Sequence, residues 1–244
     1  EPLGTGGALG NCRDVVSGRF ACFNGDIVSS LDVGKMLEQH SSMNVKGTLA
    51  LWEVEDPTRF GIVGLDEKNK VTQFKEKPKP EEVFSNLINA GSYLLEEEVF
   101  DIMPKGRHSL ERDVFPVLAQ EGSLAGFPFD GYFIDAGTPS SWHEAVRRCI
   151  EEGRYKTGSV SVGSWHQGRR TIARNSMVQD GCVVAGEVSE STLLRGARIG
   201  SGAIISNCLI GEGAVIENDV QLTNVVVGHG RIVPSGHIQS EGTI

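Results

Sequence analysis

The sequence predicts two parts of different fold class, an α/β domain followed by a left-handed parallel β-helix. Short apolar runs alternate with amphipathic segments before residue 150, which favours an α/β domain. After it, apolar residues recur at steps of six with small residues behind them, as at 199–203 and 210–214. Such a hexapeptide repeat is typical of a parallel β-helix. The repeating apolar positions are Ile172, Val178, Val184, Ile199, Ile205, Ile210, Ile216, Leu222, Val227 and Val233.

The repeat also carries suitable corner residues, since left-handed backbone angles favour Gly, Asn and Asp. The candidate corners are Asn207, Gly211, Asn218, Asp219, Asn224 and Gly228. Two steps of five residues, at 205–210 and 222–227, break the strict register, and segment 187–198 fits poorly. We therefore expect roughly ten steps in about three coils. An all-β sandwich with frequent turns is the alternative.

Length and charge limit the domain organisation and the function class. The 244 residues fit two domains of about 100 to 200 residues each. We expect a front domain at 1–152, a linker at 153–160 and the β-helix at 161–244. The net charge of −9 argues against a nucleic-acid or membrane surface, which needs a basic patch. Anionic substrates would need a bound cation and local Lys or Arg side chains.

The five cysteines are odd in number and lack metal-ligand spacing, which predicts free thiols in a reducing, cytoplasmic compartment. Cys22, Cys149, Cys182 and Cys208 lie in apolar patterns and are expected to be small buried side chains. No apolar run approaches the length of a membrane span, and no secretory signal is visible.

Strands and helices of the front domain follow from its patterning. The expected strands are 20–23, 45–54, a hairpin of 60–65 and 71–74, and 87–95. Ser30 opens a helix with Val33, Met36, Leu37 and His40 on one face. Ser109 caps a helix bearing Val114, Val117 and Leu118. Thr138 and Pro139 start a further helix, which packs through Trp142, Ala145, Val146, Cys149 and Ile150.

Two carboxylates follow apolar runs where strands are expected to end. Asp26 comes after the run at 20–23, and Asp135 comes directly after 132–134. In an open α/β sheet, ligands bind at the carboxyl ends of strands. Mg²⁺ takes oxygen ligands and bridges carboxylates to substrate phosphates, so the pair predicts a Mg²⁺ site. Each residue is weak alone, because Asn-Gly-Asp is a common turn and Asp135 also suits a loop cap.

Eight short blocks follow one another in the order of a known enzyme family. They are EPLGTGGAL at 1–9, FNGD at 23–26, DP and RFGIV within 56–63, FKEKP at 74–78, NAGSY at 89–93, ERDVFP at 111–116, GYFID at 131–135, and Gly137-Thr138-Pro139. With its β-helix, the chain resembles the sugar-phosphate nucleotidyltransferases, most of all mannose-1-phosphate guanylyltransferases. The resemblance covers nearly the whole chain and implies a Rossmann-like front domain, incomplete at its N-terminus.

The resemblance also implies a reaction. Such enzymes join a nucleoside triphosphate to a sugar 1-phosphate and release pyrophosphate, by in-line attack of the sugar phosphate on the α-phosphorus. It places Mg²⁺ on Asp26 and Asp135 and the sugar phosphate on Lys77, and these three are the implied catalytic residues. The other implied binding residues are Gly4 near the base, Glu76 on the sugar hydroxyls, and the backbone near Gly61, Asn89 and Gly91. A carboxylate accepts hydrogen bonds from hydroxyls, and metal and ammonium stabilise phosphoryl charge.

Each of these residues has a plainer alternative role. Glu76 and Lys77 also suit a solvated strand end before Pro78. Gly61 also suits crowding between strands, and Asn89 suits a bulge or turn. The remaining histidines show no ligand spacing and are expected to be surface or hydrogen-bonded groups; they are His108, His143, His166, His229 and His237.

The family's glycine-rich loop, whose Arg and Lys cradle the triphosphate, has no match in these residues. It is expected upstream of Glu1. We therefore expect a fragment that keeps the sugar half and both metal carboxylates and is inactive alone. GTP and mannose 1-phosphate, giving GDP-mannose, are the expected substrates, with glucose 1-phosphate and thymidine or uridine triphosphate as the alternative.

Two other function classes stay open. A non-catalytic regulatory subunit would bind a sugar phosphate without turnover. A hexapeptide acyltransferase would need a general-base histidine, for which His229 and His237 are the nearest candidates. The β-helix is expected to form homo-oligomers through positions such as Val225, Val226 and Ile232, which equally suit its own core.

Overall fold

The computed structural model describes residues 1–152, 160–162, 165–166, 169–170, 173–174 and 176–244. Contacts divide the chain into two compact units, Glu1–Phe133 and Ile134–Ile244. The expected linker lies outside the described residues except for residue 160, and so does Ile172 of the repeat. Among the described helices, none is long and apolar enough to cross a membrane.

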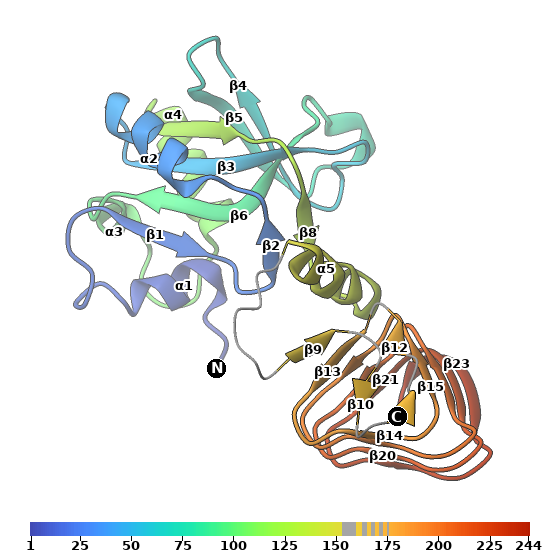
Figure 1. Cartoon of the computed structure of the whole chain (residues 1–244). Coiled ribbons are helices and arrows are strands. Elements are labelled where there is room, and N and C mark those ends of the chain that lie inside the picture. The colour runs from blue at the N-terminus through green and yellow to red at the C-terminus, as the bar shows by residue number, and fades with distance from the viewer. Residues whose placement is uncertain (153–159, 163–164, 167–168, 171–172, 175) are drawn as a thin grey trace. The chain divides into compact units, whose positions relative to one another are not determined.

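The first unit is a mixed sheet with helices beside it (Figure 1). Its helices are α1 (Gly4–Gly10), α2 (Val33–Ser42), α3 (Val99–Ile102) and α4 (Phe115–Gln120), with a 3-10 turn η1 (Pro80–Glu82) and a π-helical turn η2 (Leu110–Val114). Its strands are β1 (Phe20–Phe23), β2 (Ile27–Ser29), β3 (Gly47–Glu53), β4 (Gly61–Leu65), β5 (Val71–Glu76), β6 (Leu87–Leu95) and β7 (Leu124–Pro128). The expected α/β class is confirmed.

The sheet has the order β5-β4-β6-β3-β7, with β1 beside β6. Strands β3 and β7 run parallel, while β1, β3 and β4 are antiparallel to β6 and β4 is antiparallel to β5. The predicted hairpin is therefore confirmed, with Gly61 opposite Glu76. This topology brings the end of β5, the start of β4 and the start of β6 to one end of the sheet.

Large side chains from distant segments fill the core of the first unit. Leu49, Leu51, Tyr93, Phe115 and Leu124 are almost fully buried, and they belong to one cluster between the sheet and α4. Burying a side chain of this size stabilises a fold by about 1.5–3 kcal/mol. This core holds β6 and η2 together beneath the strand ends.

The start of α2 differs from the prediction. Asp32, and not Ser30, is the N-cap, since its carboxylate accepts a hydrogen bond from the Lys35 N–H at 3.1 Å. The Ser30 hydroxyl instead donates to the carbonyl oxygen of Asp130 at 2.8 Å, which a local pattern does not reveal. The buried face of α2 is also narrower than expected, because Met36 and His40 are buried and Val33 and Leu37 are exposed.

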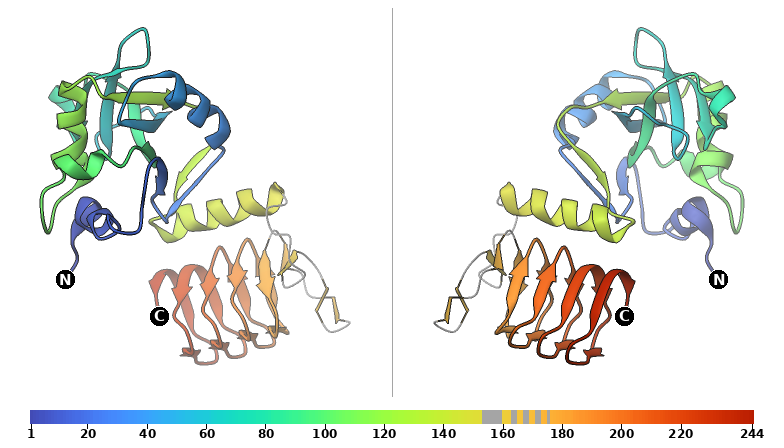
Figure 2. Two further views of the ribbon diagram at one scale, coloured as in Figure 1. Left: turned by 90° about the vertical axis from the view of Figure 1, so that its left-hand side faces the viewer. Right: turned by 90° about the vertical axis from the view of Figure 1, so that its right-hand side faces the viewer.

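The described residues of the second unit form a long helix and a stack of short strands (Figure 2). The helix is α5 (Pro139–Glu151), and β8 (Phe133–Asp135) spans the division between the units. The remaining strands are β9 (Val160–Val162), β10 (Trp165–His166), β11 (Arg169–Arg170), β12 (Ala173–Arg174), β13 (Met177–Gln179), β14 (Val183–Val184), β15 (Glu187–Ser189), β16 (Thr192–Leu193), β17 (Arg198–Ile199), β18 (Ile204–Ser206), β19 (Leu209–Ile210), β20 (Val215–Ile216), β21 (Gln221–Val227), β22 (Ile232–Val233) and β23 (Ile238–Thr243).

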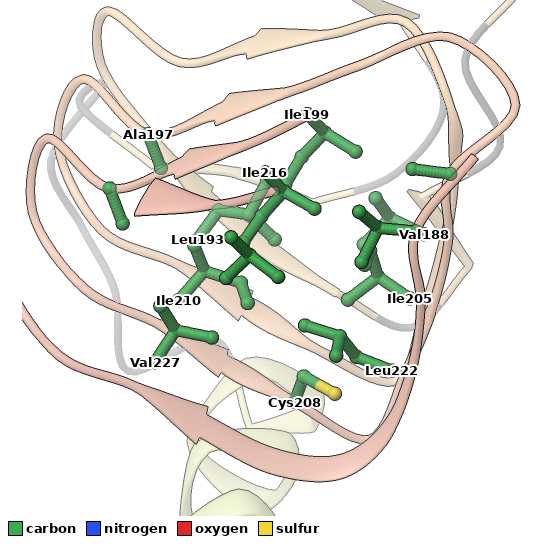
Figure 3. Packing of buried hydrophobic residues seen from close by; sticks show 14 of the residues in the cluster. Val188, Leu193, Ala197, Ile199, Ile205, Cys208, Ile210, Ile216, Leu222 and Val227 are labelled. Carbon is green, nitrogen blue, oxygen red and sulfur yellow. The ribbon is translucent and has the colours of Figure 1, made fainter. Parts of the chain in front are cut away.

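Parallel pairing confirms the predicted β-helix, which has about four turns rather than three. Val188 pairs with Ile205 and Ile205 with Leu222, so one coil contains 17 residues. Leu193, Ile210 and Val227 form a second inward column (Figure 3). The steps of five are therefore a constant part of each coil and do not break the register. Segment 187–198, which fits the hexapeptide period poorly, belongs to a regular coil as well.

Left-handed residues mark the corners at the same interval of 17. One column of positive φ is Glu190, Asn207, Asn224 and Glu241; the others are Gly196, Gly213 and Gly230, and Gly202, Asp219 and Gly236. Three of the expected corner residues, Asn207, Asp219 and Asn224, are confirmed. Gly211, Asn218 and Gly228 have no positive φ, so a left-handed corner was the wrong role for them.

Helix α5 packs along the coils within the second unit (Figure 2). Its Arg147 guanidinium lies 3.4 Å from the Glu190 carboxylate at a corner. Val225 is buried in the β-helix core, whereas Ile232 is 63% exposed. Of the thiols expected to be buried, Cys182 and Cys208 are buried, while Cys22 and Cys149 are half-buried. None of the five cysteines forms a disulfide.

Candidate functional site

The turn that carries Asp26 is fixed against strand β6. Asn24 donates its backbone N–H to the carbonyl oxygen of Gly91 at 2.8 Å. Gly91 has a φ of +63°, and a Cβ there would lie 2.7 Å from the Asn24 Nδ2 atom. Only glycine satisfies both conditions without strain. The turn before Asp26 is therefore anchored at Gly91, two positions after Asn89 in the chain. The Asp26 side chain is exposed, so its carboxylate oxygens are accessible.

Gly61 gives the Glu76 carboxylate its place. The two residues are opposite each other on β4 and β5. A Cβ on Gly61 would lie 2.8 Å from the Glu76 Oε2 atom and 2.8 Å from the Phe74 ring. Strand β4 also pairs with β6 through Ile62 and Ile88, so Glu76 and Asn89 lie at the same end of the sheet.

The Glu76 carboxylate is an acceptor without a donor. In the part of the chain that the structure describes, no hydrogen bond reaches its oxygens, although the residue is half-buried. Burial raises the pKa of this carboxyl, the neighbouring Glu111 charge raises it further, and Lys77 and Arg112 oppose the shift. A partly desolvated carboxylate of this kind is suited to accept hydrogen bonds from hydroxyl groups.

Lys77 lies where the chain leaves β5. It has a φ of +47°, an uncommon conformation for a non-glycine residue. Its backbone N–H donates to the carbonyl oxygen of Phe60 at 2.9 Å, which holds the turn beside Gly61. The Lys77 side chain is exposed, so its ammonium group is available to an anion next to Glu76.

Asn89 is oriented by two hydrogen bonds. Its Nδ2 donates to the Tyr93 hydroxyl at 3.0 Å, and its Oδ1 accepts from the Gly91 N–H at 3.2 Å. Tyr93 is buried, and burial together with the Glu111 charge raises the pKa of its phenol, so the hydroxyl keeps its proton. The Tyr93 hydroxyl donates to the Glu111 Oε1 atom over 3.5 Å.

Gly4 is the first residue of the glycine-rich helix α1, and it packs against His108 in the loop before η2. It has a φ of +75°, and a Cβ there would lie 2.5 Å from the His108 carbonyl oxygen. That oxygen accepts hydrogen bonds from the N–H groups of Gly6 and Gly7 at 3.1 and 3.2 Å. The Thr5 hydroxyl donates to Glu111 Oε2 at 2.7 Å. Hydrogen bonds and strand pairing in the first unit thus bring together Gly4, Gly61, Glu76, Lys77, Asn89 and Gly91. The turn before Asp26 is held to Gly91 as well.

Asp135, the second expected metal ligand, belongs to the second unit. Its Oδ1 atom accepts a hydrogen bond from the Gly137 N–H at 3.1 Å, in a turn before α5. The described residues contain no cluster of three or more His, Cys, Asp or Glu side chains placed to hold a metal ion. A site with two carboxylates needs no such cluster, and the Mg²⁺ site on Asp26 and Asp135 stays a prediction.

Comparisons with known proteins identify the families that the two parts of the chain match. Residues 1–152 match the nucleotidyl transferase family, and residues 161–239 match the GlmU-like C-terminal hexapeptide family. The chain belongs to the nucleotidyl transferase family. It is 35% identical over 214 residues to the mannose-1-phosphate guanylyltransferase of Mycobacterium tuberculosis, covering 86% of this chain and 57% of the relative.

Other relatives are covered to a similar extent. A probable mannose-1-phosphate guanylyltransferase 1 of Oryza sativa subsp. japonica is 31% identical over 232 residues, covering 86% of this chain and 63% of the relative. A glucose-1-phosphate adenylyltransferase of Desulfitobacterium hafniense is 28% identical, covering 86% and 57%. The crystal structure of HddC from Yersinia pseudotuberculosis matches with a TM-score of 0.50 and 31% identity, over 62% of this chain and 64% of that chain. The chain spans about three-fifths of the length of these relatives.

The histidine expectation is confirmed only in part. His108 and His143 are buried, and the His108 Nδ1 atom is hydrogen-bonded to the carbonyl oxygen of Gly106 at 2.9 Å. Among the described residues, the Nε2 atom of each ring has no hydrogen-bond partner. Burial lowers the pKa of His143, and the Arg147 charge lowers it further, so the ring stays neutral. His229 and His237 are hydrogen-bonded as expected, and the side chain of His166 lies outside the described residues.

Proposed function

We propose that this chain forms the sugar-phosphate side of a nucleotidyltransferase that joins GTP to mannose 1-phosphate and releases GDP-mannose and pyrophosphate. The half-buried Glu76 carboxylate, without a donor among the described residues and next to Lys77, carries the proposal. The names of the guanylyltransferase relatives support the choice of base and sugar. The adenylyltransferase relative makes glucose 1-phosphate the second candidate sugar.

Each residue has a distinct task in this proposal. Glu76 accepts hydrogen bonds from sugar hydroxyls, and Asn89 offers its free amide positions to the same sugar. The Lys77 ammonium holds the phosphate, which acts as the nucleophile in an in-line displacement. The absent side chain of Gly61 lets the sugar ring approach the strand, and Gly4 and Gly91 keep the neighbouring backbone close.

Asp26 and Asp135 are the residues that would hold Mg²⁺. Both are carboxylates, the ligands that this hard ion prefers, and the exposed Asp26 side chain accepts no hydrogen bond from the described residues. When bound, the ion neutralises phosphate charge and orients the transferring group. The chain's own part is to fix the Asp26 turn against Gly91.

Calorimetry with sugar phosphates tests the proposal. We expect the chain to bind mannose 1-phosphate, and Glu76→Gln to weaken binding by about 10- to 100-fold, because hydrogen bonds to a charged group contribute about 1.5–3 kcal/mol. The matched control is Glu38→Gln, which changes an exposed glutamate on α2 and should bind as the wild type does. Glucose 1-phosphate and inorganic phosphate serve as comparison ligands.

Turnover separates the remaining function classes. Metal-dependent release of pyrophosphate from GTP and mannose 1-phosphate by the natural gene product is the expected result. Sugar-phosphate binding without turnover in that product, with any nucleotide, would favour a regulatory subunit. No binding of any sugar phosphate would reject the proposed site.

Two further expectations accompany this function. The free thiols support a reducing, cytoplasmic compartment. Homo-oligomers through the β-helix stay a proposal, for which the exposed Ile232 is a more suitable contact than the buried Val225.

A further inference from the structure

We propose that Glu111 is a positioning residue of the sugar site, which fixes Asn89 through Tyr93 and ties it to the glycine-rich helix α1. The inference rests on the proposed function of this site. Glu111 belongs to the ERDVFP block at 111–116. None of the expected substrate-binding or metal-binding residues lies in this block.

Three hydroxyl groups surround the Glu111 carboxylate. Its Oε2 atom accepts from the Thr5 hydroxyl at 2.7 Å and from the Ser109 hydroxyl at 2.6 Å. Its Oε1 atom accepts from the Tyr93 hydroxyl over 3.5 Å. Two of the donors come from distant segments, Thr5 from α1 and Tyr93 from β6, and Ser109 belongs to the same turn as Glu111. A single side chain therefore connects its own turn to α1 and to β6.

The directions of these hydrogen bonds follow from the other contacts. The Thr5 hydroxyl accepts the Leu110 N–H at 3.0 Å, and the Ser109 hydroxyl accepts the Arg112 N–H at 3.3 Å. A carboxylate only accepts, so each hydroxyl directs its proton toward Glu111. The same reasoning applies to Tyr93. Its hydroxyl oxygen accepts a hydrogen bond from Asn89 Nδ2, so its proton is directed toward Glu111.

The direction of these hydrogen bonds determines the orientation of Asn89 in the sugar site. Because the Tyr93 hydroxyl donates its proton to Glu111, it presents a lone pair to Asn89, which must then turn its NH₂ group toward Tyr93. The Asn89 Oδ1 atom is left to the Gly91 N–H. The amide therefore has one orientation, and its free lone pair and remaining N–H lie at fixed positions for a sugar hydroxyl. Without a pure acceptor at 111, the Tyr93 hydroxyl is free to donate to Asn89 instead, and the Gly91 N–H alone favours the present amide orientation.

The turn that carries Glu111 is itself held in place. The Ser109 N–H donates to the Asp113 carboxylate at 2.8 Å, and Val114 and Phe115 are fully buried. The turn η2 is π-helical, a form that occurs frequently at functional sites. The ERDVFP block thus combines an anchor in the core with a carboxylate beneath the substrate residues.

A double-mutant cycle on the full chain tests the inference. Glu111→Gln and Tyr93→Phe should each weaken mannose 1-phosphate binding by about tenfold, which corresponds to about 1.4 kcal/mol. The double variant should lose little more than either single variant, because both changes interrupt one relay. Binding of inorganic phosphate, which needs Lys77 and not Asn89, should stay unchanged in all three. Glu38→Gln again serves as the control.

The outcomes separate this inference from the proposed function. If the wild-type chain binds no sugar phosphate, the proposed function fails. The relay is overturned if the wild type binds mannose 1-phosphate and both single variants bind it as tightly as the wild type does. It is also overturned if the double variant loses about 100-fold, the product of the two single losses. A loss of phosphate binding equal to the loss of mannose 1-phosphate binding would indicate general distortion and would also overturn it. If Glu111→Gln fails to fold, Tyr93→Phe, which keeps the buried ring, still tests the relay. Wild-type affinity for mannose 1-phosphate in Tyr93→Phe would overturn it.

Discussion

In the second unit a residue finds its packing partner 17 positions along the chain, as Val188 and Ile205 do, whereas in the first unit Glu111 binds a hydroxyl 106 positions away. The β-helix is thus a stack in which each coil contacts its neighbours. The first unit gathers its candidate site from separate segments. Stability in the β-helix should therefore be local and graded, and the site should depend on a few contacts between distant residues.

The largest expected effect tests how local the β-helix is. Leu193 is fully buried in an inward column, so Leu193→Ala should destabilise the second unit by about 2–5 kcal/mol through lost burial and a cavity. Hydrogen exchange should rise in β13, β16 and β19 and stay unchanged in the first unit. Val183→Ala, at a position 38% exposed, is the control. Equal deprotection of β3 would contradict the view that the units are independent.

A second test separates two reasons for glycine in the coils. A Cβ on Gly211 would lie 2.6 Å from the backbone carbon of Gly228 in the next coil, while Gly213 has a φ of +66° and open space around it. Gly211→Ala should cost about 1–3 kcal/mol through overpacking. Gly213→Ala should cost about 1 kcal/mol through backbone strain. Thermal unfolding followed in the second unit ranks the two, and the reverse order would show that stacking is looser than the distances indicate.

The same contrast explains what the sequence could predict. The repeat predicted the β-helix because inward positions recur locally, yet the period of six hid the true interval. A coil of 17 residues divides into steps of six, six and five, and left-handed residues such as Asn207 close the shorter side. Segment 187–198 fits a period of six poorly, although Val188 and Leu193 each belong to an inward column.

The sequence of the first unit predicts its site less directly than the repeat predicts the β-helix. Glu76, Lys77 and Asn89 were identified by resemblance, because a carboxylate at a strand end has the same pattern whether it is solvated or binds a substrate. The local pattern predicts a helix cap at Ser30 because the hydrogen bond of its hydroxyl to Asp130 spans 100 residues and leaves no local signal. For the same reason, nothing in the spacing of Thr5, Tyr93 and Glu111 revealed that they meet.

The smallest expected effect concerns pH and the coupling of two carboxylates. Glu76 binds hydroxyls best when ionised, and burial and the Glu111 charge hold its pKa above the ordinary value of 4.5. Mannose 1-phosphate binding should therefore weaken as pH falls through this raised pKa, where an ordinary glutamate would stay ionised. The folded unit holds the Glu76 proton more tightly than the unfolded chain, so this group makes the unit less stable as pH rises through the same range.

Glu111→Gln removes one cause of the shift and should move the loss of binding to lower pH. Lys77 and Arg112, which favour the ionised form of Glu76, remain, and Tyr93 stays protonated throughout. The sugar phosphate also titrates, with a second pKa near 6, but it does so equally for both proteins. We therefore expect the ratio of variant to wild-type affinity to rise by a few-fold between pH 7 and pH 5. A constant ratio would mean that the Glu111 charge does not reach Glu76, leaving burial as the cause of its raised pKa.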